Sequence, residues 1–152
     1  MAITSAISTS FKVEILKAVH NFTNGGNAFN CALFKALASQ TGTYGAATTS
    51  YTEMTGDSDE LAATGGYTTK GFVLTNTTPT STSTTAHLTF TANASWTTAT
   101  FTTRGCMIFN DTASGDPSVM VINFGADYSV SGGTFEIQWP VNDSSNAILR
   151  IA

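Results

Sequence analysis

The sequence is poor in charged side chains. Lys, Arg, Asp and Glu make up only 11% of the 152 residues, against about 25% in typical soluble domains. The six basic residues are scattered along the chain, and the net charge is −4. A nucleic-acid-binding surface needs clustered Lys and Arg side chains to neutralise phosphates. The sequence therefore predicts no nucleic-acid partner.

Long apolar runs are also missing. No stretch approaches the roughly 18 consecutive apolar residues that a membrane-spanning helix needs. The first 22 residues show no basic region ahead of an apolar core, which is the pattern of a secretion signal. We therefore expect no membrane partner, and we expect the chain to be made and folded in a cytoplasm.

Reactive side chains are scarce. Cys31 and Cys106 each lie in a strand-like apolar segment without the Cys/His spacing of a zinc site. Buried free thiols are the favoured interpretation, and a cross-strand disulfide is the alternative. The only histidines are His20 and His87, and no Gly-x-Ser-x-Gly motif is present. The sequence predicts no catalytic, metal-binding or cofactor-binding residue and hence no enzyme, with a structural role for His20.

The N-terminal region carries the pattern of one amphipathic helix. Four apolar residues at helical spacing form a single stripe: Phe11, Ile15, Leu16 and Val19. Ser10 is a suitable N-cap, and the sequence TNGG at 23–26 stops the helix because its glycines favour positive φ. We expect a helix over residues 10–22 with the side chain of Leu16 buried against the rest of the protein.

From residue 28 onward the pattern changes to short strands separated by turn residues. Candidate strands follow an alternating segment at 29–37: 67–75, 86–92, 96–103, 106–110, 118–124, 134–139 and 147–151, and neighbouring candidates either stay separate or merge. The segments NDTASGDP and GADYSVSGG are predicted hairpin connections. Strand 118–124 is apolar on both faces, so we expect the helix or another subunit to cover it. The fold class expected is all-β, a β-sandwich or jelly-roll-like domain spanning 1–152, β-rich over 28–152, with one N-terminal α-helix.

Residues 39–66 show no sustained periodicity, and we expect a long surface loop there. Its acids Asp57, Asp59 and Glu60 form either a solvated acidic loop, which is favoured, or a calcium site. The tyrosines Tyr44, Tyr51 and Tyr67 either fold back on the domain or form an exposed platform for sugars or a protein partner.

Several segments resemble a small protein family that recurs in the genomes of tailed bacteriophages and is usually labelled hypothetical or virion structural. The segments are SFKVEILKAVHNF, ATFTTRGCMIFND, VINFGADYSVSGGTFEIQWP and NAILRIA. The matching residues are Phe11, Lys12, Glu14, His20, Phe22, Arg104, Gly105, Asn110, Phe124, Gly125, Phe135, Pro140, Asn146, Ala147, Ile148 and Arg150. Trp139 stands where these proteins usually have Phe, and residues 39–95 match only loosely.

The resemblance implies a non-enzymatic structural component of a tailed-phage virion, made in the host cytoplasm. A capsid decoration or cement subunit is the first choice. The alternatives are a tail, baseplate or fibre-associated subunit, and, from other classes, a carbohydrate-binding module that recognises a host receptor or a hydrolase. The partners expected are other virion subunits, either the major capsid protein or tail proteins, and further copies of the chain in a homo-oligomer. No cofactor is expected.

Overall fold

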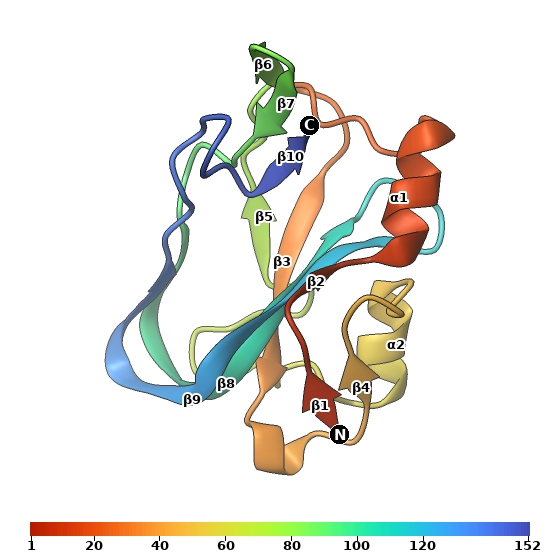
Figure 1. The fold of residues 1–152 in the computed structure, drawn as a ribbon. Coiled ribbons are helices and arrows are strands. Elements are labelled where there is room, and N and C mark those ends of the chain that lie inside the picture. The colour runs from red at the N-terminus through yellow and green to blue at the C-terminus, as the bar shows by residue number, and fades with distance from the viewer.

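A computed structural model describes residues 1–152 and shows a β-rich protein with 43% of its residues in strands and 11% in helices (Figure 1). The strands are β1 (Ala2–Ile3), β2 (Ala6–Ile7), β3 (Phe29–Lys35), β4 (Thr43–Tyr44), β5 (Phe72–Leu74), β6 (Thr80–Thr82), β7 (Thr85–Leu88), β8 (Ala94–Asn110), β9 (Ser118–Ile137) and β10 (Leu149–Ile151). The α-helices are α1 (Thr9–Leu16) and α2 (Tyr51–Gly56), and a 3₁₀ turn covers Leu37–Ser39. The prediction of a β-rich fold is confirmed, but a second helix accompanies the expected one.

The main sheet has five strands in the order β2-β9-β8-β3-β5, with every neighbouring pair antiparallel. Its centre is the long β8–β9 hairpin. The turn NDTASGDP joins the two strands, as predicted, and the side-chain oxygen of Asn110 accepts hydrogen bonds from the backbone N–H groups of Thr112 and Ala113. Two smaller sheets complete the fold: β10-β7-β6, and the parallel pair β1-β4.

The segment GADYSVSGG was wrongly predicted as a hairpin connection. It lies inside β9, which runs on through residues 118–137 and joins two predicted strands into one. The pairing with β8 shifts register at several points, and Gly125 and Gly132 adopt positive φ angles of 85° and 62°. Glycine supplies the positive φ that an L side chain would resist, so these residues bend a continuing strand instead of ending it.

Both faces of the central part of the five-stranded sheet are covered by the chain itself. One face belongs to the larger apolar cluster, in which Phe29 and Ile108 meet Phe11 of α1. The other face belongs to a second cluster, in which Val121 of β9 shares its surroundings with Tyr44 and other residues from the 43–54 segment. Helix α1 covers strand 118–124 on the first face, as expected, but neither α1 nor another subunit is needed on the second face. Residues outside the predicted helix cover it.

Helix α1 is shorter than predicted. It ends at Leu16 instead of residue 22, Ala18 takes the left-handed φ of 57°, and Ser8 occupies the N-cap position that Ser10 was expected to fill. The side chain of Leu16 is 87% exposed, so the prediction that it is buried is wrong. Neither α1 nor any other helix has the length and apolar character to span a membrane.

Residues 39–66 do not form the expected surface loop. They contain β4 and α2, and they bury Tyr44, Tyr51 and Met54 in the second apolar cluster. A β-bridge between Phe34 and Glu60 fastens the end of the segment to β3. The segment is therefore a layer of the core, held mainly by a few large residues that are too widely spaced to create a periodic pattern.

Candidate interaction surface

An apolar groove of about 550 Å³ lies between α1 and the sheet formed by β7 and β10. Ten of its fifteen lining residues are hydrophobic, among them Phe11, Ile15, Leu16, Leu88, Leu149 and Ile151. We call this surface the α1–β10 groove. In Figure 1 it corresponds to the region between the red helix and the blue C-terminal strand.

The groove exists because two elements end beside it. Phe11 turns into the core, whereas Leu16, the last residue of α1, and Ile151, the last residue of β10, stay 87% and 60% exposed. A soluble domain seldom leaves large apolar side chains together at a groove unless something else covers them. The sequence pattern missed this surface because it placed Leu16 inside a longer, docked helix.

His20 is one of the residues that line the α1–β10 groove. Its Nδ1 accepts a hydrogen bond from the side-chain amide of Asn110 at 3.1 Å, and its Nε2 lies 2.8 Å from the carboxylate of Glu14. The amide orientation of Asn110 is fixed because its oxygen accepts two backbone N–H groups, so Nε2 carries the ring proton. His20 thus ties the chain after α1 to β8, in the structural role that the sequence predicted.

His87 lies between Thr82 and Asn142. Its Nε2 is 3.1 Å from the Thr82 hydroxyl, and its Nδ1 is 3.0 Å from the side-chain oxygen of Asn142. This order of groups matches that of a nucleophile, a base and an orienting residue. Thr82, however, stands exposed on the edge strand β6, where water competes with any transition-state contact. We therefore interpret these hydrogen bonds as structural contacts that hold the β6–β7 hairpin to the segment before β10.

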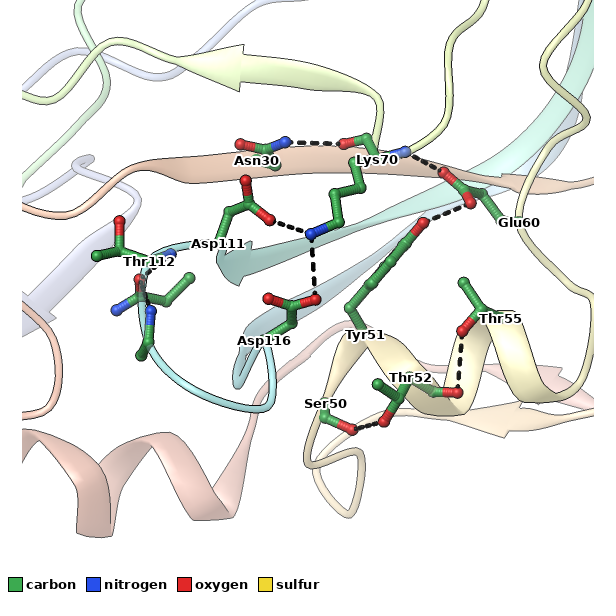
Figure 2. A network of polar contacts seen from close by, with 12 residues as sticks. Asn30, Ser50, Tyr51, Thr52, Thr55, Glu60, Lys70, Asp111, Thr112 and Asp116 are labelled. Carbon is green, nitrogen blue, oxygen red and sulfur yellow. Dashed lines mark hydrogen bonds and ion pairs between the residues drawn. The ribbon is translucent and has the colours of Figure 1, made fainter.

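Lys70 joins two distant loops (Figure 2). Its ammonium group contacts Asp111 and lies 3.3 Å from the carboxylate of Asp116, both in the β8–β9 turn. It also lies 5.8 Å and 6.0 Å from the ring centroids of Tyr51 and Phe109. The hydrogen bond to Asp111 raises the pKa of Lys70 above its ordinary value, so the side chain stays a cation and is not available as an amine nucleophile.

Glu60 holds two of the three tyrosines that the sequence singled out. Its carboxylate accepts hydrogen bonds from the hydroxyls of Tyr51 and Tyr67, at 2.6 Å and 2.8 Å, and from the backbone N–H of Lys70 at 2.7 Å. Burial raises the pKa of both phenols, and the neighbouring Glu60 charge raises them further. Both tyrosines are buried, as is Tyr44, so the exposed platform is wrong and the folded-back alternative is confirmed.

Asp59 is fully buried, so the interpretation of a solvated acidic loop is wrong for this residue. Its carboxylate accepts hydrogen bonds from the backbone N–H groups of Thr41 and Gly42 and lies 3.0 Å from the ammonium of Lys35. Burial alone would raise the pKa of Asp59, but these donors together lower it. Its neighbour Glu60 faces other partners, and no three His, Cys, Asp or Glu side chains are grouped as a metal site.

Cys31 and Cys106 are buried free cysteines on neighbouring strands. Cys31 pairs with Ile108 and Cys106 with Leu33, so the two thiols are diagonal neighbours on one face of the sheet. The hydrogen bond with Cys106, together with burial, raises the pKa of Cys31 well above its ordinary value of 9.0. These thiols therefore behave as small apolar core residues, and the disulfide alternative is not what the structure contains.

Comparisons of the chain with protein-family models, with curated proteins and with solved structures found no match.

Proposed function

We propose that this protein is a non-enzymatic structural subunit of a tailed-phage virion, with capsid decoration or cement as its place in the particle. The observation that carries the proposal is the α1–β10 groove with Leu16 and Ile151 exposed beside it. Burying such apolar surface against a neighbouring subunit contributes roughly 25 cal/mol per Å², which favours association. The phage-like segments at both ends of the chain include α1 and β10, the two walls of the groove.

The composition supports a role in close packing. Charged side chains are costly to desolvate at the centre of an interface, and only 11% of this chain is charged. The partners proposed are the major capsid protein or tail proteins, with the finished protein in the virion after synthesis in the host cytoplasm. The receptor-recognition alternative is weaker, since Tyr44, Tyr51 and Tyr67, the platform that it needed, are buried.

We also infer that the two larger sheets act as the layers of a small β-sandwich. Leu88 of β7 and Leu149 of β10 share one apolar cluster with Phe29 and Leu33 of β3. The layer formed by β6, β7 and β10 has only three short strands, and the α1–β10 groove opens beside it. A neighbouring virion subunit seated there would complete the layer.

The test is binding of the purified protein to particles that lack it, followed by co-sedimentation. Leu16→Asp should abolish binding, because a charge then enters the apolar interface, and it should leave the fold intact because Leu16 is exposed. Val73→Asp is the matched control, since Val73 is 62% exposed on β5, outside the groove. Equal binding by wild type and both variants, or no binding by wild type, would overturn the proposal.

Copy number in the mature particle separates the head from the tail. A decoration subunit should be present in hundreds of copies, whereas a tail or baseplate subunit should be present in a few copies that follow the rotational symmetry of the tail. Quantitative mass spectrometry of purified virions against the major capsid protein gives the ratio directly.

A further inference from the structure

The distal half of β9 is an open sheet edge. Strand β2 pairs with β9 only at Val121 and Met120, and beyond that point β9 pairs with β8 alone. Figure 1 shows this part of the hairpin standing clear of the other strands. The exposed residues of the segment include Tyr128, Ser129 and Ser131.

The direction of the unpaired backbone groups follows from one hydrogen bond on the far side of β8. The N–H of Thr100 donates to Gly65, away from β9, so Thr100 and its partner Ser131 form a pair without mutual backbone hydrogen bonds. Backbone groups alternate along a strand, so Ser129 and Ser131 both direct their N–H and C=O groups outward from the sheet, whereas Val130 directs its own toward β8.

This edge lacks the side chains that most directly prevent strand addition. Proteins commonly protect an open edge with lysine or proline. The segment 128–135, YSVSGGTF, contains neither and has no charged side chain. The bends at Gly125 and Gly132 confine the straight part of the edge to a few residues, which favours one short partner strand in one register.

We propose that β9 pairs with the β9 strand of a second copy of this chain, antiparallel across a twofold axis at Val130. In that register Ser129 of each copy faces Ser131 of the other, and four backbone hydrogen bonds form. The two Val130 side chains become direct neighbours. Each Asp127 lies opposite Gly133 of the other copy, so the two Asp127 carboxylates stay about 20 Å apart along the strands, beyond the range of strong repulsion.

The pairing is self-limiting. Each copy offers one such edge, so joining two edges uses both and stops at a dimer. The inference rests on the proposed function in one respect: it names the surface through which copies of the proposed virion subunit join. The edge lies on β9, whereas the α1–β10 groove lies between other elements and remains free for a different subunit.

Sedimentation equilibrium over a wide concentration range tests the dimer. Ser131→Pro removes an outward N–H without touching the pairing to β8, and it should raise the dimer dissociation constant at least about tenfold. Ser129→Ala is the control: it removes the hydroxyl contact with Thr102 but keeps the outward N–H, so it should dimerise like wild type. Circular dichroism checks that both variants are folded.

Site-specific oxidation tests the register. Val130→Cys should form a covalent dimer on a non-reducing gel, because paired residues across a twofold axis fall within disulfide reach. Asp127→Cys should not. A monomeric wild type, or a dimer indifferent to Ser131→Pro that lacks the Val130→Cys crosslink, would overturn the proposal. A monomer whose particle binding is lost on Ser131→Pro would assign the edge to a different virion protein. Dimerisation without particle binding would instead overturn the proposed function alone.

Discussion

The hydroxyl of Tyr44 donates a hydrogen bond to the fully buried carboxylate of Asp59, with 2.9 Å between the two oxygens. This contact joins β4 to the end of the segment after α2, so it closes the layer that covers the second face of the main sheet. The same carboxylate also accepts hydrogen bonds from the backbone N–H groups of Thr41 and Gly42 and forms an ion pair with the ammonium group of Lys35.

Asp59→Ala should therefore destabilise the protein strongly. The substitution leaves the buried Tyr44 hydroxyl and several partly buried donors without this acceptor, and a loss of about 3–5 kcal/mol in the free energy of unfolding is expected. Urea denaturation followed by circular dichroism measures it. Asp57→Ala is the control, because Asp57 also accepts the Tyr44 hydroxyl but is itself exposed, so its loss should cost well under half as much. Equal costs would contradict the central role of Asp59.

Stability should fall in acid through the same residue. The folded state lowers the pKa of Asp59 from its ordinary 3.8. The unfolded chain therefore binds the proton more readily, and the stabilisation that is present above about pH 4 is lost as the pH falls further. Unfolding free energies measured from pH 7 to pH 2 should show a steeper acid decline for wild type than for Asp59→Asn. Parallel curves would rule out Asp59 as the source.

Stability should also fall in strong alkali. Burial, and after it the neighbouring carboxylates, raise the pKa values of Tyr44, Tyr51 and Tyr67 above the ordinary 10. A phenol with a raised folded-state pKa contributes stability below pH 10 that is lost as the pH rises above the unfolded value. Absorbance titration should show these three phenols ionising only as the protein unfolds. Their ionisation near pH 10 in folded protein would contradict the burial described above.

Truncation to alanine should change the free energy of unfolding far more at Phe11 than at Leu16, although both residues lie on α1. Phe11 is only 2% exposed, so Phe11→Ala should cost about 3–5 kcal/mol. Leu16→Ala should change the unfolding free energy by less than about 0.5 kcal/mol, because its side chain already lies in solvent. Thermal melts compare the two directly, and a large loss for Leu16→Ala would mean that the groove wall is packed and closed.

Gly71 should not tolerate a side chain. Its φ is +70°, and an added Cβ would contact the carbonyl oxygen of Cys31 and come within 2.8 Å of the Cα of Ala32. Gly71→Ala should therefore cost at least about 2 kcal/mol. Gly56→Ala is the matched control: nothing lies within 4 Å of its Cβ position, and alanine in a helix should be neutral or mildly stabilising. Chemical denaturation of both variants measures the difference.

The sequence predicted the central hairpin well because local chemistry decides it. Apolar runs in 106–110 and 118–124 flank a turn rich in Asn, Asp, Gly and Pro, and each of these features acts within a few residues. The glycines of GADYSVSGG misled the prediction because a positive φ serves a bend within a strand as well as a turn. Only the partner strand β8 distinguishes the two cases.

The layer formed by residues 39–66 could not be predicted from periodicity, because few of its residues are buried by alternation. Burial there depends on single tyrosines that bond to acids further along the segment: Tyr44 with Asp59, and Tyr51 with Glu60. A weak signal was present, since acids and tyrosines are concentrated in one segment of a chain that has few of either. The groove was missed because the sequence pattern did not show where α1 ends. The helix stops at Leu16, and Ala18 then takes a left-handed φ.

The position of β8 between β3 and β9 also sets the order in which the chain can assemble. Strand β3 is made before its two neighbours, β5 and β8. Strand β8 is not complete until residue 110 has been made, and the β2 partner in β9 comes later still. Contacts over such sequence separations form slowly. Until β8 has been made, the edge of the apolar β3 that β8 will pair with stays open, and premature association of nascent chains at this edge is a hazard of the topology.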